Sequence, residues 1–312
     1  MINKEKGLIA FSSGDAGKDT FAGFHPAINL FYFVTVIGFS MFFLHPVCQL
    51  ISLTCAFAYA LYINGRKAVK FALVYMLPML IVTALLNPAF NHQGGTILAY
   101  LPSGNPLTLE SILYGIAASV MLITVITWFT CFNTVMTSDK FVYLFGRIIP
   151  ALSLILAMAL RFVPHFKAQI NVISNAQKCV GRDVSNGSIF QKMRHGIKIL
   201  SIMVTWALEN AIETADSMKG RGFGLPGRTA FSLYRFDKRD GVALAFIMVC
   251  AGTVIAGAAT EVYRFRYFPT IRGVWAGFYT IAVFSAYFAL CIFPMIMNIK
   301  EELVWKHIVS RT

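Results

Sequence analysis

The sequence predicts an all-α, polytopic membrane protein with about six spans and two long amphipathic helices between spans 4 and 5. Composition is the first reason: 57% of the 312 residues are hydrophobic and only 13% are charged, whereas a soluble domain carries about 25% charged residues. The second reason is that the charges are segregated, which leaves long uncharged stretches such as Phe71–Leu109 and Gly273–Ile299. About 20 apolar residues cross the hydrocarbon core as a helix. Continuously apolar stretches favour helices over barrel strands, which alternate.

Spans 1 and 2 come from the first uncharged stretch, Thr20–Gly65, which is long enough for two helices. His45 and Pro46 interrupt it near its middle, with no charge nearby. Proline breaks a helix interior but suits a first helical turn. We therefore expect a tight helical hairpin, with span 1 near Pro26–Leu44 and span 2 near Val47–Ile63.

The other uncharged stretches supply one span each. We place spans 3 to 6 near Phe71–Leu86, Glu110–Cys131, Gly241–Thr260 and Gly273–Met297. Small residues spaced by four, Gly252 with Ala256 and Gly273 with Gly277, would permit close helix packing. No span carries Asp, Glu, Lys or Arg in its middle. An ionisable residue at that depth is the usual mark of a proton relay or ion path. The lack of one argues against a transporter that works alone.

The basic residues predict the orientation of the spans, because Lys and Arg collect on the cytosolic side. They precede span 1 and join spans 2 and 3, but are absent from Asn87–Leu109; they are Lys4, Lys6, Lys18, Arg66, Lys67 and Lys70. The N-terminus is therefore expected in the cytosol of a multi-pass cell-membrane protein. After four spans the segment Asp139–Asp240, with fifteen Lys and Arg against seven acidic residues, returns there. Arg264, Arg266 and Arg272 would lie outside, so either the charge rule is broken locally or the late spans are miscounted.

Five regions follow from this topology. They are a cytosolic N-terminal segment (1–24), a membrane domain with spans 1–4 (25–135), a cytosolic coupling domain (136–240), spans 5–6 (241–299) and a cytosolic tail (300–312). Met1–Thr20 lacks the apolar core of a signal peptide, so span 1 is expected to remain in the membrane. The net charge of +13 is explained by anionic headgroups facing the cytosolic loops, and we expect no nucleic-acid partner.

The central segment differs from the spans because its apolar residues recur at helical spacing among charges. One stripe contains Phe162, Phe166, Ile170, Ile173 and Val180, and a second contains Ala207, Ala211, Ala215 and Met218. Each set lies on one face of a helix. We expect two long amphipathic helices, which either pack on each other as a small cytosolic bundle or present these stripes to a partner.

No catalytic, cofactor-binding or metal site is expected. Ser13–Thr20 resembles a phosphate loop, but its first glycine is too close to Gly17-Lys18 and Asp19 occupies the Ser/Thr position, so we expect only an N-terminal turn. The six histidines show no i, i+4 pairing. The six cysteines lack the paired spacing of a zinc site or disulfide framework. A membrane enzyme acting on lipid is disfavoured because no nucleophile, acid and base fall at one depth.

The two amphipathic helices end similarly. Cys179-Val180-Gly181-Arg182-Asp183 follows the first, and Lys219-Gly220-Arg221-Gly222-Phe223-Gly224 follows the second. Glycine lets a helix end through the left-handed conformation, and a cation complements the negative helix terminus. Ordinary capping explains one such end. Two such ends, each closing a helix with an apolar stripe, indicate a pair of docking sites for a protein partner, since arginine can bind a carboxylate bidentately.

These features make the sequence similar to the transmembrane T component of energy-coupling factor (ECF) transporters, the family that includes the cobalt-transport Q-type permeases. The similar segments are His25–Asn29 before span 1, Leu160-Arg161-Phe162-Val163-Pro164 opening the first cytosolic helix, the two helix ends, and Gly222–Thr229. The resemblance implies a non-catalytic scaffold without a cofactor. Two coupling helices, each ending in an Ala-Arg-Gly-like motif, would dock in two cytosolic ABC ATPases.

The resemblance also implies that the membrane part, in the lipid bilayer, holds a substrate-binding S component for vitamin or metal-ion uptake. The coupling arginines would be Arg182 and Arg221, with Gly181, Gly220 and Gly222 beside them. This sequence departs from the family pattern in having Gly-Arg-Asp at the first end and Gly-Arg-Gly at the second. The carboxylate of Asp183 could bind the Arg182 side chain and keep it from a partner. The alternative function is a stand-alone secondary transporter or channel, which would transport without partners.

Overall fold

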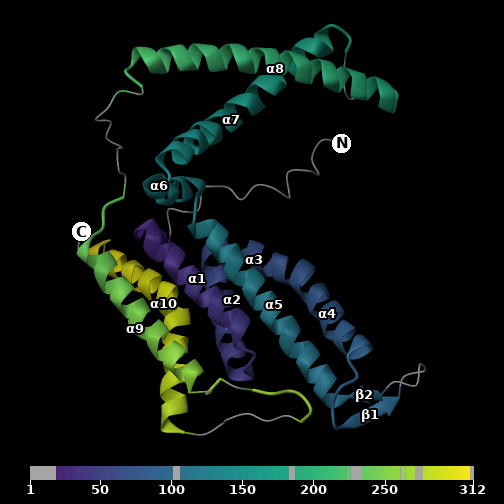
Figure 1. The fold of residues 1–312 in the computed structure, drawn as a ribbon, viewed down its shortest axis with the longest axis vertical. Coiled ribbons are helices and arrows are strands. Elements are labelled where there is room, and N and C mark those ends of the chain that lie inside the picture. The colour runs from purple at the N-terminus through teal and green to yellow at the C-terminus, as the bar shows by residue number, and fades with distance from the viewer. Residues whose placement is uncertain are drawn as a thin grey trace. The chain divides into compact units, whose positions relative to one another are not determined.

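The computed structural model describes residues 19–100, 106–182, 187–223, 225, 234–260, 262–263, 265–270 and 277–309. The chain divides into two compact units (Figure 1). The membrane unit comprises Met1–Thr137 and Tyr234–Thr312, and the middle unit comprises Ser138–Leu233. The membrane unit contains the predicted spans, and the middle unit contains the two predicted amphipathic helices. The sides of the membrane assigned to these regions stay predictions.

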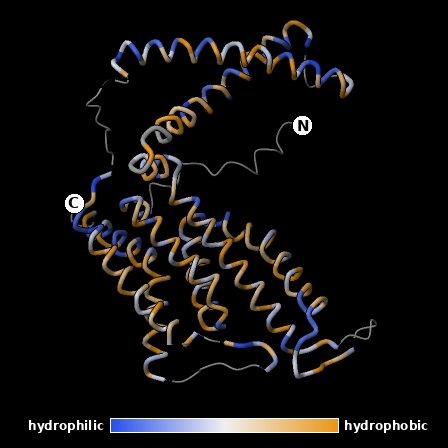
Figure 2. The backbone as a smooth tube through the Cα atoms, in the orientation of Figure 1, coloured by the Kyte–Doolittle hydropathy of each residue, from blue (hydrophilic) through white to orange (hydrophobic). Residues whose placement is uncertain are grey.

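The predicted polytopic helical fold is confirmed. Within the described residues, five helical segments are long and apolar enough to cross a membrane: α2 (Pro46–Asn64), α3–α4 (Arg66–Phe90), α5 (Leu109–Val135), α9 (Lys238–Ala259) and α10 (Phe278–Val309, whose span ends at Ile308). A shorter apolar helix, α1 (Pro26–Phe42), precedes them. The third segment consists of α3 (Arg66–Phe71), a π-helical turn (Ala72–Met76) and α4 (Leu77–Phe90). Figure 2 shows these helices mainly hydrophobic, with hydrophilic residues at several of their ends.

Two local features extend beyond the predicted spans. The connection after α4 forms a short two-stranded antiparallel hairpin, β1 (Ile97–Tyr100) with β2 (Pro106–Thr108), within the otherwise helical fold. Proline starts β2, and β1 consists of the four apolar residues Ile97 to Tyr100, a segment too short for a stable helix. The last helix continues past the predicted end at Met297 because i, i+4 charge pairs such as Glu302–Lys306, at 2.9 Å, support its polar end.

The same dipeptide starts the first two helices. His25 precedes Pro26 and His45 precedes Pro46, and each histidine Nδ1 accepts a hydrogen bond from the backbone N–H two residues later, at 3.2 and 3.3 Å. Proline stands at the first helical position, where its missing N–H is not needed. The predicted hairpin of spans 1 and 2 is confirmed, and both histidines act as helix caps.

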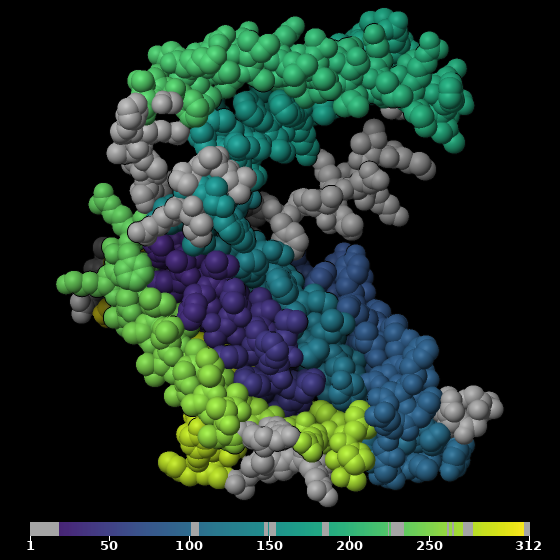
Figure 3. Space-filling model, viewed as in Figure 1, coloured from purple at the N-terminus to yellow at the C-terminus, as the bar shows by residue number. Residues whose placement is uncertain are grey.

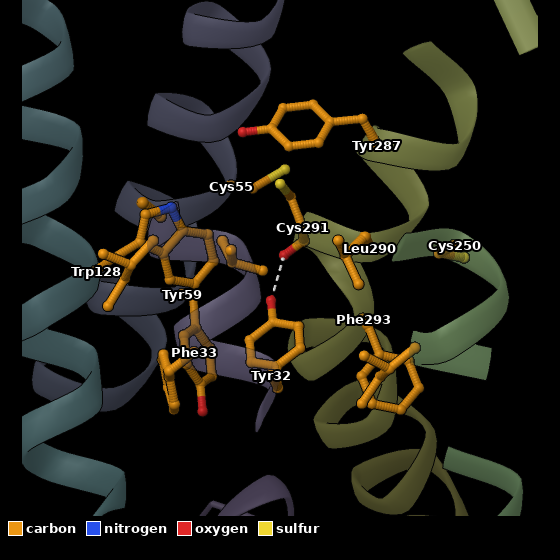
Figure 4. Packing of buried hydrophobic residues seen from close by; sticks show 14 of the residues in the cluster. Tyr32, Phe33, Cys55, Tyr59, Trp128, Cys250, Tyr287, Leu290, Cys291 and Phe293 are labelled. Atoms are coloured by element: carbon orange, nitrogen blue, oxygen red, sulfur yellow. Dashed lines mark hydrogen bonds between the residues drawn. The ribbon is translucent and has the colours of Figure 1, made fainter. Parts of the chain in front are cut away.

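Helix α5 is central in the membrane unit and packs against α1, α2 and α4. Trp128 on α5 is fully buried, and its indole N–H donates to the hydroxyl of Ser52 on α2 at 2.9 Å. Figure 4 shows Tyr32 on α1 donating to the carbonyl of Cys291 on α10, at 3.2 Å. Figure 3 shows α9, α1, α5 and α4 side by side on one face. The core is therefore aromatic, and the polar groups of Trp128 and Tyr32 are paired internally, as a bilayer favours.

One end of the membrane unit gathers three connections. The N–H of Gly95, before the hairpin, donates to the carbonyl of Pro269 at 3.0 Å, and the hydroxyl of Tyr267 donates to the carbonyl of Leu44 at 3.0 Å. The connections α1–α2, α4–α5 and α9–α10 therefore meet at this end. Arg266 belongs to it. The late spans are thus α9 and α10 as counted, and the side of the membrane on which this connection lies stays a prediction.

The opposite end is tied to the N-terminal segment by a buried carboxylate. Asp19 is 8% exposed and accepts hydrogen bonds from the N–H of Phe21 (3.1 Å), the amide of Asn298 (2.6 Å) and the hydroxyl of Tyr59 (2.8 Å). Residues before Asp19 lie outside the described part of the chain. The predicted N-terminal turn therefore ends in an anchor that joins α2 and α10.

Close helix packing occurs at glycines other than the predicted ones. A Cβ on Gly115 of α5 would lie 2.8 Å from the carbonyl oxygen of Ala84 on α4, and one on Gly257 of α9 would clash with the side chain of Val283 on α10. A Cβ on Gly252 would meet nothing within 4 Å. Gly273 lies outside the described residues. The spacing of Gly252 and Ala256 therefore does not mark a close contact at Gly252, because spacing alone does not reveal which helix face meets a neighbour.

Replacing Gly115 with leucine is expected to separate α4 from α5, because backbone carbonyl atoms cannot move aside as a side chain can. We expect a loss of about 1–3 kcal/mol, the usual cost of overpacking. Thermal unfolding of the detergent-solubilised protein, followed by circular dichroism, measures this loss. Gly252→Leu is the matched control in an open position, and equal midpoints for the two variants would contradict the prediction.

Candidate docking site at two helix ends

The middle unit consists of α6 (Ser138–Ile148), α7 (Pro150–Cys179) and α8 (Ile189–Gly220). Pro150 stands in the first turn of α7, where proline is favoured, and a capping box of Ser188 and Gln191 starts α8. The segment Leu160–Pro164, expected to open the first helix, lies inside α7. The helix starts earlier because Pro150 provides its N-terminus.

Helices α7 and α8 pack on each other through one small cluster. Ile173 of α7 meets Ile199 and Met203 of α8, and Phe166, Ile202 and Trp206 surround them. The rings of Phe166 and Trp206 lie edge to face, with centroids 5.8 Å apart. This geometry is favourable for aromatic pairs. The cluster fixes the crossing point of the two helices.

The structure uses only part of the predicted stripes in this cluster. Phe166 and Ile173 belong to it, whereas Phe162 stacks on Phe166 with ring centroids 5.7 Å apart and Ile170 is exposed. The stripe on α8 takes no part: Ala207 and Met218 are half-buried, and Ala211 and Ala215 are exposed. Sequence reasoning missed Ile199, Met203 and Trp206. Their spacing of four and three was the signal that could have found them.

An apolar stripe on α8 lies away from α7 and is exposed along the helix. Its members follow steps of three and four residues, which place them on one face; they are Phe190, Met193, Ile197, Leu200, Val204 and Leu208, and Ala211 and Ala215 continue them. A helix apolar on two opposite faces has one face to bury on its neighbour and a second for another surface. The predicted residues Ala211 and Ala215 belong to this second face.

The end of α7 is a Schellman turn. The N–H groups of Val180, Gly181 and Arg182 donate to the carbonyls of Gln177 (3.2 Å), Lys178 (2.9 Å) and Gln177 (2.9 Å). Gly181 has a φ of +76°, which only glycine adopts at low cost. Val180 is therefore the C-cap residue, and Arg182 is the second residue beyond it. Asp183 lies outside the described residues.

The end of α8 has the same hydrogen bonds. The N–H groups of Arg221, Gly222 and Phe223 donate to the carbonyls of Met218 (3.2 Å), Lys219 (3.0 Å) and Met218 (3.0 Å). Gly222 has a φ of +78°. The C-cap residue is Arg221, with φ −86° and ψ 10°, close to the φ −92° and ψ 12° of Val180. Gly220 is the last helical residue and needs no special conformation.

Both arginines are exposed and available for a partner. Among the residues that the structure describes, neither Arg182 nor Arg221 has an ion-pair partner. The nearby cation Lys219 lies 3.9 Å from the carboxylate of Asp216, and both side chains are largely exposed. Such a surface pair contributes little to stability. The positive charge of both ends therefore faces solvent, where a carboxylate of another chain can reach it.

Comparison with known proteins identifies a transporter family. The family described as "Cobalt transport protein" (CbiQ) matches residues 24–231, more than half of the chain. A protein of Staphylococcus aureus named "Energy-coupling factor transporter transmembrane protein EcfT" is 27% identical over 243 residues, which cover 71% of this chain and 86% of that protein. A similarly named protein of Listeria monocytogenes is 27% identical over 208 residues, covering 62% of this chain and 74% of that one.

A shorter but more similar match is the EcfT protein of Lacticaseibacillus paracasei. It is 36% identical over 105 residues, which cover 33% of this chain and 40% of that protein. The chain thus spans less than half of this relative's length. The family match includes α7, α8 and both of their ends, because these elements lie within residues 24–231.

Proposed function

This chain belongs to the cobalt transport protein family CbiQ, and from that membership we propose that it is the non-catalytic coupling subunit, the T component, of an ECF-type ABC importer. Its partners are two cytosolic ABC ATPase subunits and a membrane-embedded S component that binds a vitamin or metal ion. Hydrolysis of ATP belongs to the ATPases. The observation that carries the proposal is the pair of identically built, solvent-facing ends of α7 and α8.

The two ends are the points at which the ATPases push. Binding of ATP closes the gap between the ATPases and moves α7 and α8 relative to each other. Trp206 and its neighbours form the contact through which one helix transmits force to the other. Helices transmit force along their axes because every backbone hydrogen bond lies along that direction. The bound S component tilts in response, so that its binding site opens to the cytosol and releases the cargo there.

The exposed stripe on α8 supplies docking area for a partner of this assembly. Its side chains are large and apolar, and several are more than half exposed. Contiguous apolar surface of this kind marks a protein or membrane contact. The stripe runs along α8 from Phe190 to Ala215, which is about 38 Å at 1.5 Å per residue.

The orientation in the cell membrane follows from the same proposal. The N-terminus, the α2–α3 connection and the middle unit lie in the cytosol, and the β1–β2 hairpin end lies outside. The charge distribution supports this orientation, because Arg66, Lys67 and Lys70 fall at the start of α3.

Co-purification tests the proposal. The full chain, tagged and extracted in mild detergent from its own cells, is expected to bring two ATPase subunits and a small hydrophobic membrane protein in fixed stoichiometry. Reconstituted alone, it should transport neither vitamins nor metal ions. Transport by the isolated chain would favour the stand-alone transporter or channel and contradict the coupling subunit.

A further inference from the structure

The two helix ends are equivalent in backbone but not in the side chains they present. The matching hydrogen bonds and glycines align Gly181 with Gly222 and therefore Val180 with Arg221. Arg182 aligns with Phe223 instead. In an Ala-Arg-Gly-like motif the arginine precedes the glycine, and only the end of α8 has this order. The end of α7 carries valine in the arginine position.

The position of Arg182 prevents it from replacing the missing arginine. A residue in the left-handed conformation reverses the chain direction at a helix end. Val180 stands before that reversal and Arg182 after it, so their side chains leave the backbone in different directions. Val180 is 67% exposed and projects an uncharged, β-branched side chain at the tip of α7.

We propose, on the basis of the proposed function, that the two ends dock in chemically different sites. The end of α8 inserts Arg221 into a groove that holds a carboxylate. The end of α7 inserts Val180 into an apolar pocket, and Arg182 remains at its rim. A valine in the first site would leave a desolvated carboxylate without a partner, and an arginine in the second would bury an unpaired charge. Neither end can therefore substitute for the other.

Two cysteine positions allow the docking sites to be mapped directly. Cys179 is the one exposed cysteine in the described part of the chain, and the alignment pairs it with Gly220. A Cβ on Gly220 would meet nothing within 4 Å, so Cys179→Ser with Gly220→Cys moves the thiol to the matching place on α8. A short thiol-to-amine crosslinker is attached to the unaltered chain at Cys179 and to the variant at position 220, each in the intact complex. The two thiols should crosslink to different partner peptides. Reaction of both thiols with the same peptide would overturn the assignment.

Substitutions test the chemistry of the two sites in the same complex. Val180→Arg is expected to reduce co-purified ATPase at least about tenfold, which is the loss for one unpaired buried charge at 1.4 kcal/mol per decade. Val172→Arg is the matched control, because Val172 lies on the same helix and is 60% exposed. Arg182→Ala should retain ATPase within about twofold, since a rim charge contributes little. Far-UV circular dichroism of each purified chain verifies that it is folded.

The outcomes separate this inference from the proposed function. Absence of ATPase from the unaltered chain contradicts the coupling function itself. Normal ATPase on the unaltered chain, with Arg182→Ala losing it and Val180→Arg retaining it, contradicts only the assignment of Val180.

Discussion

Replacing Arg221 with alanine is expected to abolish ATP-driven uptake of the cargo while the protein still reaches the membrane. Arg221 is exposed, makes no ion pair within the described residues and ends α8 at its C-cap. Its removal therefore leaves the fold intact. In the complex, however, it would leave a groove carboxylate unpaired, which costs about 1–3 kcal/mol or more for a charged group. Uptake of labelled vitamin or metal ion by intact cells measures the effect.

Two further variants establish the cause of this loss. Arg194→Ala removes an exposed arginine from the same helix, away from its end, and should leave uptake unchanged. Arg221→Lys keeps the charge but not the planar, bidentate geometry, so partial uptake is expected. Normal uptake by Arg221→Ala, with equal protein in the membrane, would refute a coupling role for this residue.

Replacing Asp19 with leucine is expected to destabilise the membrane unit more than any substitution discussed above. The carboxylate accepts hydrogen bonds from the Tyr59 hydroxyl, the Asn298 amide and the Phe21 N–H. Leucine would leave the Tyr59 hydroxyl and the Asn298 amide without this acceptor, whereas the Phe21 N–H keeps a second acceptor, the Asn298 side-chain oxygen at 3.2 Å. A buried donor without a partner costs about 1–3 kcal/mol, so a total loss of about 3 kcal/mol or more is expected.

Five buried cysteines provide the measurement. Cys48, Cys55, Cys131, Cys250 and Cys291 all belong to the membrane unit, so a thiol-reactive dye reports its thermal opening, whereas Cys179 reacts from the start. Asp19→Asn is the control, because it keeps an oxygen acceptor without the charge, and it should melt between the other two proteins. An unchanged melting curve for Asp19→Leu would show that the anchor contributes nothing.

The sequence by itself determined the spans, the starts of the first two helices and the presence of two capped helices. Spans are readable because the bilayer sets a minimum apolar length, and no distant contact can change that requirement. The starts at Pro26 and Pro46 are readable because proline and its preceding histidine act within two residues. The first helix end is equally local, since Gly181 is the one glycine available there.

The folded structure alone decided which residues meet across distance and in which register. Asp19, Tyr59 and Asn298 are far apart in the chain, and nothing in their own surroundings pairs them. Trp206, rather than the predicted alanine stripe, contacts α7, because the crossing angle of two helices selects the face that is buried. At the end of α8, Gly220, Gly222 and Gly224 could each turn the chain. The turn forms at Gly222 and places Arg221 at the tip of α8, whereas the turn at Gly181 leaves Arg182 beyond the tip of α7.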